Sequence, residues 1–415
     1  MRNNKKRWTS WKVVVSVAVS LLITSANYVA GNTSFPLPDE MKVLQSWDQL
    51  KKWINIDRDS IPDEVMLIDV SYDKQLADYI VNDIPVGQYA ITNRQKLFDF
   101  LTAARQADNY KYIMLDVIFG RGIRSPQDSA LFQLITSMKR IVIPVHQDEP
   151  LEDSILYRKA ANADYTVTWE ETNFARFQFI HDGVPSMPLR MYQELNGDSI
   201  RQCGFLFFSQ GWLCRNGITL KMPIRFTADT EEEGHLQKIN VLHLGCDVLA
   251  LDSIVPISDE IKNKIVVIGN FSEDIHETYA GLMPGSIICL NAYYALLQGD
   301  HVLLGRYSGV MLFYLFMVIL YFFMSMAYLN GFSLSDKTQN PWGKLLLSLV
   351  SINVLFWIIA ILAYILPLNI VYNVWIPILA FSLLDFVVNI LNNNKTNKHE
   401  KNTIPAAPLS GTSVD

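Results

Sequence analysis

The sequence predicts an α/β extracytoplasmic domain with a mostly parallel sheet and an antiparallel insertion, joined to an α-helical transmembrane bundle of four helices. Three observations support this prediction. Apolar, strand-like runs alternate with helix-like periods across the first part of the chain. Short β-like runs interrupt that alternation between residues 170 and 240. Long uncharged runs follow residue 306, and a shorter apolar segment lies near the N-terminus.

The N-terminal region combines a basic arm, residues 1–10, with an apolar segment, residues 11–30. Serine and threonine residues interrupt the apolar segment, which fits either a transmembrane signal anchor or a signal peptide cleaved near Ala26. We favour the anchor. Both interpretations place the residues that follow on the far side of a membrane.

Residues 31–306 are expected to form one extracytoplasmic domain. Its strand runs consist almost entirely of valine, isoleucine, leucine and methionine, and helical periods separate them, which favours a parallel sheet covered on both faces. The expected strands are residues 65–70, 112–117, 140–145 and 265–268, and the expected helices are residues 94–107, 129–139 and 285–298. Shorter runs at 174–181, 205–208 and 222–226 predict the antiparallel insertion.

Three further membrane helices are expected between residues 307 and 391, at about 307–328, 345–366 and 370–391, because each run provides about 20 apolar residues. The polar tail, residues 392–415, is expected to be disordered. Lysine and arginine residues concentrate in the arm, in the loop near Lys337 and Lys344, and in the tail. By the positive-inside rule both termini are cytoplasmic, and the large domain lies outside the inner membrane.

Charge limits the choice of partners. The whole chain has a net charge of −6, although the parts expected to face the cytoplasm are basic, so the outer domain is strongly acidic. A nucleic-acid partner is therefore excluded, because phosphate binding needs a basic surface. An anionic ligand would need a local basic pocket, for which Arg94 and Arg225 are candidates, although ion-paired structural arginines are commoner.

All four cysteines lie in the outer domain, where an oxidising compartment permits disulfides. Cys203 and Cys214 flank a short segment and could join the two strands of a hairpin. Free buried thiols are the alternative, and the spacing matches no zinc pattern.

Polar residues follow several of the expected parallel strands. Asp69, Asp116 and His146 come at strand ends, and Asp274 and His276 follow a fourth strand after a short loop. Ligands bind beyond the carboxyl ends of parallel strands, so this set could hold a cation or titrate as a pH-sensitive pair. The simpler interpretation is that the aspartates cap helices or bond loop amides. His276 would then bridge Asp274 and Thr278.

No pattern pairs a nucleophile with a base, and no glycine-rich phosphate loop is present in the sequence. We therefore predict neither catalysis nor a cofactor. Asp385 lies within the last expected membrane helix. It is either functional at that depth or extends its carboxylate toward the inner face.

Residues 264–285 (KIVVIGNFSEDIHETYAGLMPG) resemble the signature of the CHASE2 sensory domain, an extracytoplasmic input module of bacterial signalling proteins. The resemblance comprises a strand, a D-x-H-x-T loop and a Pro-Gly helix start. Weaker matches follow the family order, and an anchor before the domain with three helices after it is also the family layout. These matches lie at residues 67–69, 93–94, 115–119 and 223–226.

Two departures qualify the resemblance. Cys289 stands where the family has a histidine at the helix start, and no cyclase or kinase domain follows the last helix. The resemblance implies a membrane-anchored sensor that relays an unknown extracytoplasmic signal to a separate cytoplasmic or membrane partner, with a homodimer left open. The alternatives are an envelope scaffold or assembly factor, and a metal-dependent envelope enzyme built on Asp69, Asp116, Asp274 and His276.

Overall fold

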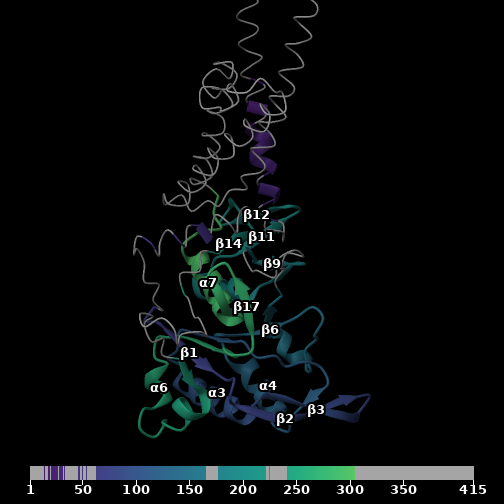
Figure 1. Cartoon of the computed structure of the whole chain (residues 1–415), viewed down its shortest axis with the longest axis vertical. Coiled ribbons are helices and arrows are strands. Elements are labelled where there is room, and N and C mark those ends of the chain that lie inside the picture. Colours follow the sequence, from purple (N-terminus) through teal and green to yellow (C-terminus); the bar gives the residue numbers. More distant parts are fainter. Residues whose placement is uncertain are drawn as a thin grey trace, which may run out of the picture. The chain divides into compact units, whose positions relative to one another are not determined.

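The computed structural model describes residues 62–164, 176–220, 224 and 241–303, together with scattered positions between 14 and 53 (Figure 1). The chain divides into two units. One comprises Met1–Asn27, Met311–Leu362 and Tyr372–Asp415, and the other comprises Tyr28–Val310 and Ala363–Val371. Most of the described residues belong to the second unit, which holds the predicted α/β domain.

A six-stranded sheet with the order β15-β1-β16-β4-β6-β7 forms the centre of this domain, and every neighbouring pair is parallel. All residues of β1, β16 and β4 are buried, which explains why their sequences are apolar runs apart from Asp69 at the end of β1. The predicted parallel sheet is confirmed. Its strands are β15 (Val241–His243), β1 (Val65–Asp69), β16 (Ile265–Gly269), β4 (Tyr112–Leu115), β6 (Ile141–Val145) and β7 (Ala160–Asn162).

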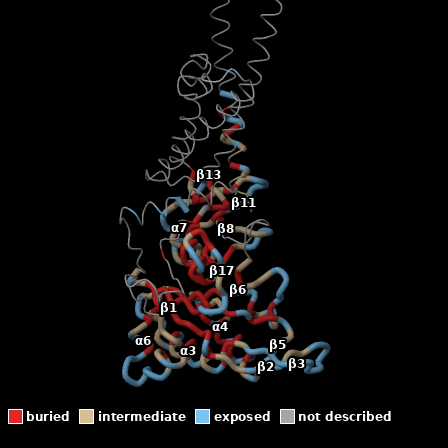
Figure 2. The backbone as a smooth tube through the Cα atoms, in the orientation of Figure 1, coloured by how far each residue is buried: buried red, intermediate tan, exposed pale blue. Residues whose placement is uncertain are grey.

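Two apolar cores cover the two faces of the sheet. Side chains alternate along each strand, so Ile113 and Leu115 of β4 join one core while Tyr112 and Met114 join the other. Figure 2 shows the buried residues concentrated along the sheet and the helices beside it. The first core contains residues of α3 (Arg94–Ala107), α4 (Asp128–Ser137) and α6 (Ile257–Glu260), and the second contains residues of α5 (Met187–Asn196) and α7 (Gly285–Leu297).

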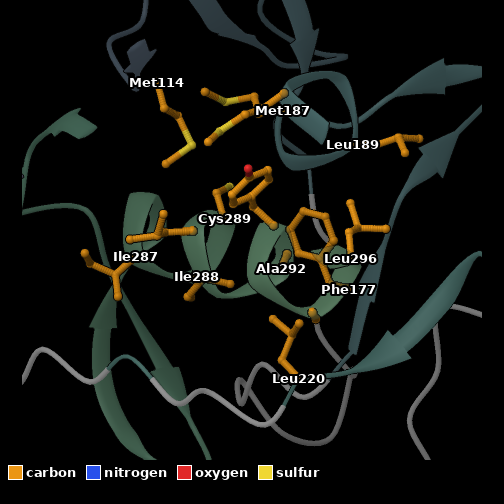
Figure 3. Packing of buried hydrophobic residues seen from close by; sticks show 14 of the residues in the cluster. Met114, Phe177, Met187, Leu189, Leu220, Ile287, Ile288, Cys289, Ala292 and Leu296 are labelled. Carbon is orange, nitrogen blue, oxygen red and sulfur yellow. The ribbon is translucent and has the colours of Figure 1, made fainter. Parts of the chain in front are cut away.

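Helix α7 is the most deeply buried helix in the described part of the chain. Its own side chains are apolar or small on nearly every side, as expected of a helix enclosed by other elements. Met114 from β4 and Met187 from α5 face the side of α7 that carries Cys289 (Figure 3). The first turn of α7 lies at the carboxyl edge of the sheet, because Ser286 lies against Gly269, the last residue of β16.

The predicted antiparallel insertion is also confirmed, in the form of several small sheets. Strands β11, β12 and β13 form a meander, and β8 pairs with β14. Residues 165–175, 221–223 and 225–240 lie outside the described residues, and so does Arg225. The strands are β8 (Arg176–Gln178), β9 (Ile180–His181), β10 (Val184–Pro185), β11 (Ile200–Cys203), β12 (Leu206–Ser209), β13 (Trp212–Cys214) and β14 (Gly217–Thr219).

Two antiparallel hairpins were not expected from the sequence. Strands β2 (Lys74–Val81) and β3 (Ile84–Thr92) pair through a two-residue turn in which Asn82 and Asp83 both have positive φ, and β5 (Ile123–Arg124) pairs with β2. The loop expected around His276 forms a second hairpin, β17 (Ile275–Thr278) and β18 (Gly281–Pro284). The remaining short elements are η1 (Ser154–Arg158) and η2 (Leu244–Leu249).

The segment that leads into the domain is bonded to the small sheets. The Tyr28 hydroxyl donates to the carbonyl oxygen of Cys214 at 3.0 Å and accepts from the backbone N–H of Phe207 at 3.1 Å. The Asn32 side-chain oxygen accepts from the backbone N–H of Asn216 at 2.7 Å. These bonds hold the incoming segment against β12, the end of β13 and Asn216.

The segment that leads out of the domain is bonded to the same strand. The backbone N–H of Leu303 donates to the Leu213 oxygen at 3.2 Å, and the N–H of Arg215 donates to the His301 oxygen at 2.8 Å. We call this meeting point the junction; it comprises residues 28–32, 213–216 and 301–303. Incoming and outgoing segments are thus joined through β13.

The membrane predictions fall largely outside the described residues. Within the described part of the chain, no helix has the length and apolarity needed to cross a bilayer. The described positions of the expected anchor, residues 14, 17, 18, 20–26 and 28–30, are helical. The three expected C-terminal helices and Asp385 lie outside the described residues.

Candidate functional site

Four of the sequence-predicted residues come together at the carboxyl edge of the sheet. Asp116 follows β4, His146 follows β6, Asp274 lies between β16 and β17, and His276 lies on β17. The strands β16, β4 and β6 are parallel neighbours, so their ends meet at one edge. Asp116 interacts electrostatically with both Asp274 and His146. We call these four residues the strand-end group.

Asp274 and His276 form a direct pair. The Nε2 atom of His276 lies 2.9 Å from Oδ1 of Asp274, and the backbone oxygen of Asp274 accepts from the N–H of Gly285 at 3.1 Å. Burial raises the pKa of Asp274, against the attraction of His146, and burial lowers the pKa of His276. The pair therefore resists carrying two full charges.

Asp116 has a different environment. Its side chain is partly buried, and no described residue donates a hydrogen bond that would stabilise its carboxylate. Burial and then repulsion from Asp274 raise the pKa of Asp116 to about 7, although the attraction of His146 opposes them. Asp116 is thus a carboxyl group of the site whose charge changes near neutral pH.

Two glycines allow α7 to approach this edge closely. A Cβ atom on Gly285 would lie 2.6 Å from Oδ2 of Asp274 and 3.1 Å from Nε2 of His276. A Cβ atom on Gly269 would lie 2.9 Å from Oγ of Ser286. Any other residue at either position would displace the side chains of the site.

The first turn of α7 carries a further polar group. Pro284 is its N-cap residue and provides no side-chain hydrogen bond to the helix. The hydroxyl of Ser286 is buried, and no described residue is its hydrogen-bond partner. The first N–H groups of a helix carry a partial positive charge. The start of α7 therefore offers a positive potential beside the Asp274–His276 pair.

Cys289 lies one turn further along α7. Burial raises the pKa of its thiol well above the ordinary value, and the carboxylates of Asp116 and Asp274 raise it further. A protonated, buried thiol is a poor nucleophile. Cys289 therefore adds bulk to the site without supplying a reactive group.

His146 is oriented by a neighbour that the sequence did not single out. Its Nδ1 atom lies 2.9 Å from Oδ1 of Asp164, and the other oxygen of Asp164 accepts from the N–H of Gln147 at 2.9 Å. Asp164 follows β7, the next strand of the sheet. The strand order that brings them together was not readable from residue spacing.

Asp69 holds loops in place, as in the simpler of the two predicted interpretations. Its Oδ1 atom accepts from the backbone N–H of Ser71 at 2.9 Å, from the Ser71 hydroxyl, and from the N–H of Phe271 at 3.2 Å. His243 lies 3.5 Å from the other oxygen. The carboxylate joins the loops that follow β1 and β16.

Arg94 is a structural ion-pair residue in the described domain. It is 1% exposed, its Nη2 donates to the oxygen of Ile118 at 3.1 Å, and its Nε lies 3.4 Å from Asp128. Its guanidinium lies 4.3 Å from the ring centroid of Phe119. Burial lowers the pKa of Arg94 to about 10, while Asp128 opposes that shift. The commoner of the two predicted roles therefore fits its contacts.

Thr278 closes the turn between β17 and β18. Its hydroxyl donates to the oxygen of Gly281 at 2.7 Å and accepts from the N–H of Ala280 at 3.1 Å. Of the predicted bridge from His276 to Asp274 and Thr278, the contact with Asp274 is therefore present. The Thr278 hydroxyl instead bonds the backbone of the turn.

The expected disulfide between Cys203 and Cys214 is not formed. Both thiols are free, with Cys203 exposed and Cys214 buried. The two cysteines lie on β11 and β13, and β12 pairs with both strands and separates them. The hairpin that we expected them to join is a three-stranded meander, which explains the error.

A second polar cluster lies near the junction. The hydroxyl of Ser209 donates to Asp198 at 2.7 Å, Tyr192 lies 3.3 Å from the same carboxylate, and Nε2 of His301 lies 3.4 Å from the Ser209 oxygen. The serine bonds the acid directly, so the arrangement differs from a nucleophile activated by histidine. These contacts fasten the outgoing segment to the meander.

Within the described part of the chain, no three histidine, cysteine, aspartate or glutamate side chains are placed to hold one metal ion. Comparison with known proteins gives no further assignment, since no family model, curated protein or solved structure matches the chain.

Proposed function

We propose that the protein is a membrane-anchored extracytoplasmic sensor of bacterial signal transduction with a CHASE2-like domain. A stimulus acts at the strand-end group, and the response leaves the domain through the segments that lead toward the membrane. A separate partner then produces the output.

The strand-end group is the observation that supports this proposal. Two acids and two histidines collect at the edge of a parallel sheet where ligands bind in related architectures. The two acids repel each other and His146 attracts both, and the group contains no nucleophile placed beside a base. Such a cluster is suited to a change of charge or occupancy more than to covalent chemistry.

The junction supports the second half of the proposal. Helix α7 begins at the strand-end group and ends at Leu297, shortly before the outgoing segment that bonds β13. A helix of this length spans about 20 Å. A displacement of its first turn would therefore reach the junction through one rigid element. A stimulus can drive that displacement only if its affinity differs between two states.

The proposal is tested by isolating the full-length protein with its partners in detergent. Co-purification of a kinase or cyclase, in amounts that change when Asp116 is replaced by asparagine, is the expected result. The exposed acid Asp99 provides the matched control, since Asp99→Asn leaves the strand-end group unchanged. A partner set without signalling enzymes, and identical in all three proteins, would count against a sensor.

An envelope scaffold is the second candidate, and the β2–β3 hairpin favours it. Seven consecutive residues of β3 are exposed, and Leu76, Ile84 and Val86 are 67%, 63% and 58% exposed. The exposed tip of this hairpin is visible in Figure 2. Exposed apolar groups of this kind are often protein contacts. A stoichiometric envelope complex that is lost in Ile84→Ser would favour the scaffold.

A further inference from the structure

We propose that the ligand of the strand-end group is the proton: Asp116 takes up and releases one proton beside Asp274, and the domain thereby reads external pH. This inference rests on the proposed sensing function and names its stimulus.

The contrast between Asp69 and Asp116 is the first argument. Each aspartate stands at the carboxyl end of a buried central strand, and those strands flank β16 on either side. Asp69 receives two backbone N–H groups and a hydroxyl, which stabilise a carboxylate. Asp116 receives no such donors among the described residues. Among the described residues, the fold therefore supplies hydrogen-bond donors to Asp69 and none to Asp116.

The groups that face Asp116 give the second argument. Asp274, from the loop after β16, repels a negative charge on Asp116, whereas His146, after β6, attracts it. His276, on β17, contacts Asp274, and burial favours its neutral form. Cys289 on α7 stays protonated. An ionised Asp116 therefore meets one unfavourable acid, and the partly exposed imidazole of His146 compensates only in part.

The start of α7 gives the third argument. The buried hydroxyl of Ser286, which no described residue bonds, lies against Gly269, and Cβ of Asp116 lies against the same glycine. A hydroxyl can donate to a carboxylate or accept from a carboxylic acid, so it can follow either state of Asp116. The positive end of α7 attracts the acid only when it is ionised. Proton release at Asp116 therefore changes the force on the first turn of α7.

Infrared difference spectroscopy between acidic and basic pH, on the full-length protein in detergent, tests the site. Wild type should show a protonated carboxyl band that disappears with a midpoint near the Asp116 pKa of about 7. Asp116→Asn should lose that band, and Asp99→Asn should keep it. A band that is absent from wild type, or unchanged in Asp116→Asn, overturns the proposal.

Hydrogen exchange of residues 299–303 separates the proton site from the sensing function. Comparison of wild type with Asp116→Asn at one pH cancels the intrinsic pH dependence of exchange. We expect the two proteins to exchange equally at pH values on the acidic side of the transition, and wild type to differ on the basic side. If the carboxyl band titrates but hydrogen exchange is the same in the two proteins, Asp116 is a proton site and the proposed transmission to the junction is wrong. If the carboxyl band is absent while another stimulus changes hydrogen exchange of residues 299–303, the sensing function is supported and the proton is not its stimulus.

Discussion

Asp116 connects the chemistry of one residue to the stability of the domain. Its pKa rises from 3.8 to about 7 on folding, so the folded state binds a proton more tightly than the unfolded state. A group of this kind stabilises the fold at low pH relative to high pH. The stabilisation is lost as the pH rises from the unfolded value through the folded value.

Replacement of Asp116 by asparagine should remove this loss. Asparagine imitates the neutral acid, so the variant should be more stable than wild type above pH 7 by about 1–2 kcal/mol, less than the full shift implies because Asp116 is partly exposed. Near pH 4 the two proteins should be alike. Thermal unfolding at several pH values measures the difference. Parallel stability curves across the whole range would refute the assignment.

Gly285 tests how closely α7 approaches the site. In Gly285→Ala the new Cβ atom would lie 2.6 Å from Oδ2 of Asp274 and 3.1 Å from Nε2 of His276, so the pair must shift. We expect a loss of about 1–3 kcal/mol in the free energy of unfolding, as for other overpacked positions. Gly87 is the control, because a Cβ atom there meets nothing within 4 Å. Equal stability of the two variants would contradict the packing.

Cys203 and Cys214 differ in reactivity. Cys203 is exposed, while burial followed by repulsion from Asp198 raises the pKa of Cys214 to about 12. A maleimide should therefore label Cys203 in the native protein and reach Cys214 only after unfolding. Mass spectrometry of the labelled peptides reads the result. Recovery of a peptide with the two cysteines joined would instead show that the disulfide forms and would contradict the free thiols.

At the scale of elements, the central strands were predictable because burial on both faces leaves apolar side chains up to the end of each strand. This holds for β1, β4 and β16. The β2–β3 hairpin was missed because its exposed strands mix polar and apolar residues and give neither period cleanly. The short hairpin of β17 and β18 was read as a loop, since its pairing depends on the turn that Thr278 closes.

The candidate site was also predictable in part. Parallel strands share one carboxyl edge, so residues that follow them can be grouped before the strand order is known. Asp69 belonged to that set by position and separated from it by its loop contacts. Ser286 and Asp164 could not be found in this way, because their roles depend on how α7 and β7 pack against the edge.

Tyr28 tests the junction. Tyr28→Phe removes the donor to the Cys214 oxygen and the acceptor for the Phe207 N–H, and both backbone groups are buried. Unpaired buried groups should cost about 1–3 kcal/mol in stability. The control is Tyr89→Phe on β3, since Tyr89 is 52% exposed. If Tyr28→Phe and the control have the same free energy of unfolding, the hydrogen bonds of Tyr28 do not hold the incoming segment.

At the scale of the whole molecule, the two segments that bracket the domain are bonded to one strand. Tyr28 and Leu303 are far apart in the sequence, yet both contact β13. A change at β13 therefore acts on both segments together. Whether that change can cross a membrane depends on the topology that the basic residues predict.

Fusions to alkaline phosphatase test this topology, because the enzyme is active only outside the cytoplasm. A fusion after Asp300 should be highly active, and a fusion after Thr396 should be nearly inactive. The reason is that lysines concentrate in the arm, in the loop at Lys337 and Lys344, and in the tail. A fusion after Lys337 is an internal control and should also be inactive. The opposite pattern would place the strand-end group in the cytosol, where buffered pH would leave Asp116 no external signal to read.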